Sequence, residues 1–346
     1  MLKRILSLTL CTLMLIPFAG CKKKEYALSV DTSAPTPSVA EPEPETYINP
    51  LTGEKNLSKD DALLRPVAIM VNNISVAQPV QTGLNDADII YETEVEGGIT
   101  RLLAVYKDFK NVAQIGTVRS ARYVYIDLAA GHNAIYAYHG VNETYAAPHL
   151  NAVDSIVVGT NNGGVRLSNG LASEHTLYAY GDKFWESIKK QKYDYTLKSE
   201  SATWMKFADE KSPVTLENPS SSVTVPFSSS YKTTFKYDAN TGRYTRFFRD
   251  TERKDYNTKE SITVKNVFVL NTNISYYSDN YCRKIDLTSG SGYYFVNGTY
   301  TKINWKKGAA SNSFTFTKED GSELTVNPGN SWVCIADSSR SQAIIG

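Results

Sequence analysis

The hydrophobic pattern of this 346-residue chain changes near residue 200, and this change constrains the fold more than any other feature. Before it, apolar runs typical of buried strands, such as 66–71, alternate with helical periodicity at 121–130 and 180–190. After it, the helical signal disappears, and short β-branched or aromatic stretches alternate with turn sequences. We therefore expect an α+β fold, with a mixed α/β N-terminal domain over 61–205 and a mainly antiparallel, β-rich C-terminal domain over 206–346.

Residues 1–21 are predicted to be a lipoprotein signal peptide together with its lipidated cysteine. Lys3 and Arg4 precede an apolar run over 5–18, which ends at Ala19-Gly20-Cys21. The alternative is an uncleaved membrane anchor, but the run is shorter than the roughly 20 residues that a spanning helix needs. We expect Cys21 to be acylated and inserted into membrane lipid, which places the protein on the extracytoplasmic face of the cell membrane.

Residues 22–60 are predicted to form a disordered tether. The segment is rich in Pro, Glu, Ser and Thr and has almost no apolar periodicity. It begins with three lysines, Lys22, Lys23 and Lys24, which can lie against anionic lipid headgroups. An acyl chain combined with a basic cluster gives a durable membrane anchor.

Composition excludes several classes of function. The formal net charge is +1, and the 37 basic and 36 acidic residues are interspersed, so we expect no nucleic-acid partner. There is no CxxC pair, and we predict neither a metal site nor a cofactor. Cys282 and Cys334 lie in strand-like segments, where they form either a disulfide or two small buried thiols. The aromatic residues of the second half, including Trp204, Trp305 and Trp332, either stack on sugar rings or pack in the core.

All four histidines fall in one window of the first half, and this clustering indicates a site. They are His132, His139, His149 and His175. His139 ends an apolar strand and precedes Gly140, so its ring is expected at the end of a sheet, where α/β folds commonly bind ligands.

A second candidate feature is the segment Gly116-Thr-Val-Arg119-Ser120-Ala-Arg122, which precedes the predicted helix. If Ser120 caps the helix, free backbone N–H groups lie next to the guanidinium groups of Arg119 and Arg122 and form an anion site. Its ligand would be a phosphate, a carboxylate or an acidic sugar. Alternatively, the two arginines only pair with nearby carboxylates.

Glu92, Glu94 and Glu96 provide such carboxylates, because they alternate along one predicted strand and face the same side. A two-residue Gly97-Gly98 hairpin loop would place Glu94 directly opposite Arg101 as a cross-strand ion pair. Glu92 or Glu96 then becomes a candidate general acid or base, provided that it reaches the arginines and histidines.

Several motifs resemble those of a known family. Examples are Gly116-Thr-Val-Arg-Ser-Ala-Arg122 and the stretches 65–73, 83–92, 95–101, 290–295, 303–307 and 327–332. These are similar to motifs of bacterial lipoproteins of the YerB type, a two-part family of uncharacterised function found mainly in Gram-positive bacteria. The resemblance implies no reaction, but by position it selects Glu92, Glu96, Arg101, Arg119, Ser120, Arg122, His139 and His175. The chain departs from the family at Glu174-His175-Thr176, where the usual pattern is Pro-His-Asn.

These features support two hypotheses. In the first, a tethered lipoprotein binds an anionic cell-wall glycan or an envelope protein, with Arg101, Arg119, Ser120 and Arg122 as ligand-binding residues. In the second, an enzyme cleaves or modifies peptidoglycan or a wall polymer, with Glu92, Glu96, His139 and His175 as acid and base candidates. An enzyme needs these groups about 2.6 to 3.2 Å apart in a closed cleft, whereas a binding protein can keep them on an open face.

Overall fold

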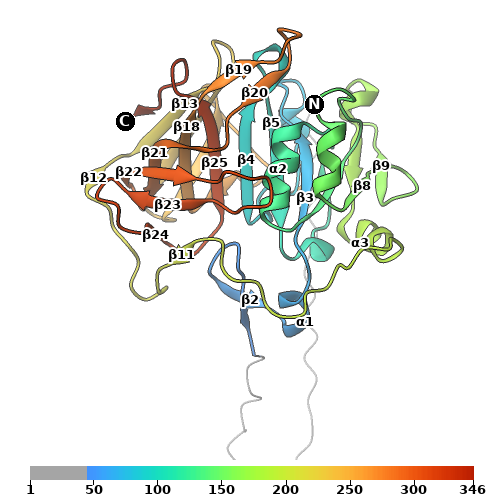
Figure 1. The fold of residues 1–346 in the computed structure, drawn as a ribbon, viewed down its shortest axis with the longest axis horizontal. Coiled ribbons are helices and arrows are strands. Elements are labelled where there is room, and N and C mark those ends of the chain that lie inside the picture. The colour runs from blue at the N-terminus through green and yellow to red at the C-terminus, as the bar shows by residue number, and fades with distance from the viewer. Residues whose placement is uncertain (1–44) are drawn as a thin grey trace, which may run out of the picture. The chain divides into compact units, whose positions relative to one another are not determined.

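The computed structural model describes residues 45–346 (Figure 1), and its largest element is an 11-stranded sheet. Cys21, the predicted signal peptide and most of the predicted tether lie outside the described residues. The first half of the chain contributes one side of the sheet, in the order β8 (Ser155–Val157), β7 (Ile135–Tyr138), β3 (Val67–Asn72), β5 (Thr100–Tyr106) and β4 (Ile89–Glu94). No helix within residues 45–346 has the length and apolar character needed to span a membrane.

The second half of the chain extends the same sheet. From β4 it continues through β25 (Ser331–Asp337), β18 (Asn266–Thr272), β21 (Ser289–Val296) and β22 (Thr299–Lys306). β12 (Asn218–Pro219) and β23 (Thr315–Lys318) both pair with β22. One continuous sheet therefore crosses the domain boundary that we predicted between residues 205 and 206.

The strand β25 makes this continuity possible, because it pairs in parallel with β18 on one side and with β4 on the other. Every residue of β25 is buried, which fits a strand covered on both faces. The expectation of a mainly antiparallel second half missed these two parallel pairings. Most other pairings in that half are antiparallel, as predicted.

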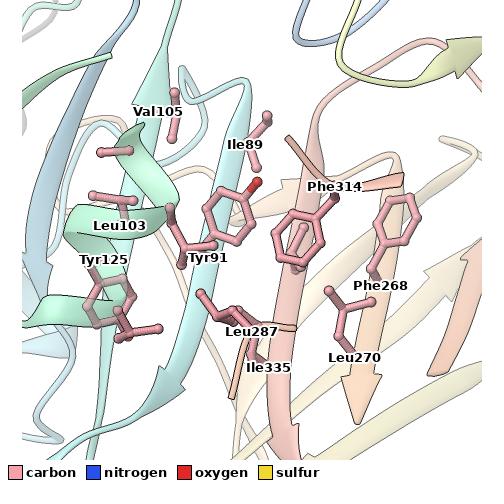
Figure 2. Packing of buried hydrophobic residues seen from close by; sticks show 14 of the residues in the cluster. Ile89, Tyr91, Leu103, Val105, Tyr125, Phe268, Leu270, Leu287, Phe314 and Ile335 are labelled. Carbon is pink, nitrogen blue, oxygen red and sulfur yellow. The ribbon is translucent and has the colours of Figure 1, made fainter. Parts of the chain in front are cut away.

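The two faces of the large sheet are covered differently. The helix α2 (Tyr123–Gly131) packs on one face, and Figure 2 shows the rings of Tyr91 from β4 and Phe314 side by side in that layer of the core. Their ring centres are 6.3 Å apart, so residues from both halves share this core. Trp305 and Trp332 are also buried core residues, which excludes them as exposed sugar platforms.

A six-stranded sheet covers the opposite face. It contains β13 (Ser222–Pro226), β14 (Lys232–Asp238), β15 (Arg243–Phe248), β16 (Thr251–Glu252), β17 (Thr263–Val264) and β26 (Ile344–Ile345). Alternate residues of β13, among them Val223 and Val225, point into the core beneath the large sheet. This alternation is typical of antiparallel strands with one face in water.

The helices α2 and α3 lie where the sequence predicted helices, but the start of α2 differs from the prediction. α3 (Gly181–Lys189) fits the predicted helix over 180–190. α2 starts at Tyr123, with Arg122 at the N-cap and no capping side chain, so the prediction that Ser120 caps this helix was wrong. The physical reason is that Ala121 is held in an extended bridge with Val141, and its N–H donates to the Gly140 carbonyl at 2.8 Å.

The part of the predicted tether that is described is ordered. β1 (Tyr47–Ile48) pairs with β2 (Lys55–Leu57), and Leu51 between them is only 4 % exposed. The indole N–H of Trp204 donates to the Leu51 carbonyl at 2.7 Å. The prediction that the disordered tether extends to residue 60 was therefore wrong over 47–60. The apolar residues of this stretch pack against distant parts of the chain, and local composition does not reveal such contacts. The short helix α1 (Lys59–Ala62) follows, capped by Ser58.

Both cysteines of the described chain are free thiols. Cys334 lies in β25 at the centre of the large sheet, whereas Cys282 lies next to β20 (Arg283–Ile285). Each is a small buried residue, which was one of the two alternatives open from the sequence.

Candidate functional site

Three loops meet where β3 and β7 end, and they carry most of the predicted site residues. They are the loop 117–122 before α2, the loop after β7, and η5 (Ser173–His175) before β10 (Leu177–Ala179). The N–H of Arg119 donates to the Met70 carbonyl at 3.1 Å, and the N–H of His139 donates to the Arg119 carbonyl at 3.0 Å. Because β3 and β7 are parallel, both end at the same edge of the sheet, where α/β folds commonly bind ligands.

Four arginines, which we call the arginine cluster, surround this edge: Arg101, Arg119, Arg122 and Arg166. Arg101 is only 6 % exposed and donates to the Ser120 carbonyl at 2.5 Å. Burial, together with the positive charges of Arg122 and Arg119, lowers the pKa of Arg101 to about 10. Arg101 therefore stays charged at neutral pH, and the structure brings it beside Arg119 and Arg122, with which the family resemblance grouped it.

Glu96 forms an ion pair with Arg122, whose Nε donates to the Glu96 carboxylate at 2.5 Å. Burial alone would raise the pKa of Glu96, but the hydrogen bond and the charge of Arg122 outweigh it and lower that pKa. Glu96 is consequently an ionised partner of the cluster at neutral pH. The sequence made Glu96 a candidate general acid or base, but an ionised carboxylate has no proton to donate, and its ion pair with Arg122 makes it a weak base.

His175 is buried beside Arg119 and belongs to the same site. The Asn72 side-chain amide donates to Nδ1 of His175 at 2.9 Å, so Nε2 carries the proton and faces the Glu174 carboxylate at 3.4 Å. Burial lowers the pKa of His175, and the nearby charge of Arg119 acts in the same direction. Glu174 also lies 3.9 Å from Arg119, and it is the second carboxylate at this edge.

His139 also adjoins Arg119, because its backbone N–H donates to the Arg119 carbonyl. Nδ1 of His139 donates to the Val158 carbonyl at 2.7 Å, and this leaves Nε2 to accept a hydrogen bond from Arg166 at 3.2 Å. Both ring nitrogens are engaged, and a neutral ring satisfies both bonds. Arg166 also donates to the Ser173 carbonyl, which links β9 (Gly164–Arg166) to η5.

Glu92 is not part of this site, and its prediction as a catalytic residue was wrong. The carboxylate is fully buried between the two sheets, where it accepts hydrogen bonds from Asn73, Thr100, Thr233 and the Trp332 indole. Burial raises the pKa of Glu92, against the charge of Arg246 and these hydrogen bonds. A carboxylate sealed between the sheets reaches no solvent-borne ligand.

Glu94 does not pair with Arg101 as the sequence predicted. The loop between β4 and β5 is longer than two residues, because the Val95 N–H pairs with the Ile99 carbonyl, and this shifts the register so that Glu94 faces Thr100. Glu94 instead forms ion pairs with Arg283 at 2.5 Å and Arg340 at 3.4 Å. The three alternating glutamates thus reach three different environments.

Two of the four clustered histidines, His139 and His175, lie at this edge of the sheet, and the other two do not. His132 is packed against Tyr91 and Trp204 in the core, and burial lowers the pKa of His132 to about 3. His149 pairs with Asp127 on α2. Arg166 and Glu174, by contrast, reach the site through the pairing of β9 with β10, and no motif in the sequence marks them.

Comparison with known proteins defines a two-part class of unknown function. Residues 51–194 match the family described as "Protein of unknown function (DUF3048) N-terminal domain", and residues 223–333 match the corresponding C-terminal domain. The chain therefore belongs to the DUF3048 family of YerB-type proteins, as the resemblance of its motifs predicted.

Two relatives support this assignment. The chain is 30 % identical over 299 residues to a protein named as lipoprotein YerB of Bacillus subtilis (strain 168). The aligned residues cover 83 % of this chain and 85 % of the relative. The fold is similar to the crystal structure of the YerB protein from Bacillus subtilis, with a TM-score of 0.73 and 26 % identity. That match covers 86 % of this chain and 99 % of the other.

Proposed function

We propose that this protein is a lipid-anchored lipoprotein on the extracytoplasmic face of the cell membrane, where it binds an anionic cell-wall component through the arginine cluster. The N-terminal sequence ending at Cys21 and the lipoprotein name of the Bacillus relative support the anchor. The protein would act as an accessory or scaffold in wall metabolism.

The observation that carries this proposal is the excess of positive charge at the loop edge. Four guanidinium groups face two carboxylates, those of Glu96 and Glu174. The side chains of Arg119 and Arg122 are only 24 % and 19 % exposed, so water screens their charges less than it would on an open surface. The Nε of Arg119 is buried and has no hydrogen-bond partner among the described residues, so a carboxylate or phosphate bound beside it would satisfy this donor.

The same geometry weighs against a wall-cleaving enzyme. Glu92 is sealed in the core, Glu96 is ionised in an ion pair, and both ring nitrogens of His139 already have partners. These groups suit the binding of an anion better than proton transfer during bond cleavage.

The test is sedimentation of residues 22–346 with purified peptidoglycan sacculi that retain their anionic polymers. Arg119→Gln should weaken retention by about tenfold, which is the effect of losing a charge-assisted hydrogen bond. Arg249→Gln is the matched control, because Arg249 is exposed and its side chain contacts the Ser230 carbonyl and the Phe248 ring, outside the arginine cluster. That variant should bind as the wild type does.

Three results would contradict the proposal. Equal losses in both variants would indicate unspecific charge attraction, and no retention of the wild type would exclude a wall ligand. In the latter case, capture of the chain by membrane proteins would favour the envelope-protein partner. Release of muropeptides that disappears in His139→Ala would establish the enzyme instead.

A further inference from the structure

The two carboxylates at the arginine cluster are held in very different ways. The Glu96 side chain is 8 % exposed, and its carboxylate accepts a hydrogen bond from Nε of Arg122 at 2.5 Å. The Glu174 side chain is 60 % exposed, and its Oε1 lies 3.9 Å from Nη2 of Arg119, which is too far for a hydrogen bond. Glu96 is therefore a fixed counterion of the cluster, whereas Glu174 is a loose one.

Two nitrogen donors from different residues lie next to the Glu174 carboxylate. Besides Nη2 of Arg119, Nε2 of His175 lies 3.4 Å from the same Oε1 atom. Nε2 carries the ring proton, because Nδ1 accepts a hydrogen bond from the Asn72 amide. Both distances are longer than those of a good hydrogen bond to a carboxylate, so Glu174 occupies this position without satisfying either donor well.

The two donors stay in place without the help of the Glu174 carboxylate. Nη1 of Arg119 donates to the backbone carbonyl of residue 174 at 3.2 Å, and the Arg119 Nε is buried. His175 is only 6 % exposed and is held by Asn72. An exposed ion pair contributes little to stability, because water screens the charges and a flexible side chain loses entropy when it is fixed. A ligand can therefore displace the Glu174 carboxylate at small cost.

The position between Arg119 and His175 suits an acid with one negative charge. Of the two donors, only Arg119 is charged, since the ring of His175 accepts at Nδ1 and is neutral. A carboxylate carries one charge and enters on a single substituent, as Glu174 does. A phosphate monoester carries nearly two charges at pH 7. A phosphodiester has two substituents to lead away, and the buried ring of His175 closes one side of the position.

We propose that a carboxylate of the wall ligand binds between Arg119 and His175 by displacing Glu174, whose own carboxylate is a built-in competitor for this position. This inference rests on the proposed function, since it names the anionic group of the ligand and the residues that hold it. The apparent affinity is then reduced by the fraction of molecules in which Glu174 occupies the position.

The first experiment compares the retention of Glu174→Gln and wild-type residues 22–346 on purified sacculi. Glutamine keeps the size of the side chain and the backbone carbonyl that holds Arg119, but it removes the competing charge. Retention should become about threefold to tenfold tighter. Glu186→Gln is the matched control, because Glu186 is also 60 % exposed and pairs with Lys189 on α3, outside the cluster. That variant changes the net charge equally and should bind as the wild type does.

A double variant tests whether Glu174 competes for Arg119 in particular. In the Arg119→Gln background, Glu174→Gln should bring no gain, because the residue for which it competes is absent. Near-ultraviolet circular dichroism verifies that each variant is folded.

Modified sacculi identify the acid of the ligand. Amidation with a carbodiimide and ammonia neutralises carboxylates and should abolish retention. Hydrofluoric acid removes phosphodiester-linked polymers but leaves carboxylates, so retention should survive this treatment.

The outcomes distinguish this inference from the proposed function. If Glu174→Gln binds as the wild type does, or more weakly, while Arg119→Gln still loses retention, Glu174 is not a competitor and only the anion site stands. Equal gains in Glu174→Gln and Glu186→Gln would reduce the effect to net charge and overturn the inference. Retention that is lost after hydrofluoric acid but not after amidation would overturn the carboxylate assignment. If sacculi retain no variant and no wild type, both proposals fail.

Discussion

Replacing Arg246 with methionine should destabilise the protein strongly, although this residue lies between the two sheets and is not part of the arginine cluster. The guanidinium group is fully buried and donates to the Asn73 side chain at 3.0 Å and to Gln81 at 3.4 Å. It stands 4.8 Å from the Trp332 ring, and its charge offsets that of Glu92. Methionine fills much of the same volume, so the main effect is electrostatic.

The expected loss is about 3 to 5 kcal/mol of unfolding free energy, the usual cost of leaving one member of a buried charge pair alone. Glu92→Gln removes the orphan charge but keeps an acceptor for Thr100 and Thr233. The double variant should therefore lose roughly 2 kcal/mol less than the sum of the single variants. The loss in Arg246→Met should also shrink at acidic pH, because protonation neutralises the isolated carboxylate.

The assay is equilibrium unfolding of residues 22–346 in urea at pH 7, monitored by tryptophan fluorescence. Arg249→Met is the control, because this arginine is exposed, and its effect should stay within about 0.5 kcal/mol. A loss below about 1 kcal/mol in Arg246→Met, or strict additivity in the double variant, would refute a buried charge pair between the sheets.

Three further predictions concern pH, charge and the N-terminal segment. Burial raises the pKa of Asp88 to about 7, so the folded protein keeps a proton that the unfolded chain releases above about pH 4. The unfolding free energy should fall from pH 4 to pH 7 by on the order of 3 kcal/mol, and urea titrations of Asp88→Asn should show a flatter pH dependence. Glu96→Gln frees Arg122 from its carboxylate and should increase retention on sacculi by about threefold, so weaker retention would contradict the role of the cluster. Leu51→Ala should cost about 2 to 4 kcal/mol in thermal or urea unfolding, whereas no change would mean that residues 47–57 are not part of the folded core.

Local patterns predicted the elements of the fold more reliably than their connections. The apolar runs that became β3 and β5 and the periodicity of α3 are local properties, and each lies where the sequence indicated. The insertion of β25 between β18 and β4 depends on contacts between distant segments. No local pattern encodes such a pairing, which is why a boundary near residue 205 looked natural and the continuous sheet did not.

The site was predictable where one short segment carries several functional groups. Arg119 and Arg122 lie in one motif, and their proximity needs no tertiary information. Glu92 and Glu96 looked equivalent in the sequence because they alternate along one predicted strand. In the structure, the second sheet covers Glu92, whereas the longer hairpin loop places Glu96 beside Arg122 in the arginine cluster.

The location of the bound ligand tests the central proposal most directly, and backbone hydrogen exchange measures it. Residues 22–346 would be compared with and without soluble wall fragments obtained by digesting sacculi. Slower exchange is expected in the loop 117–122, in the loop after β7 and in η5, because a bound anion holds these loops together. Protection confined to other parts of the chain, or no protection at concentrations that saturate retention on sacculi, would contradict an anion site at the arginine cluster.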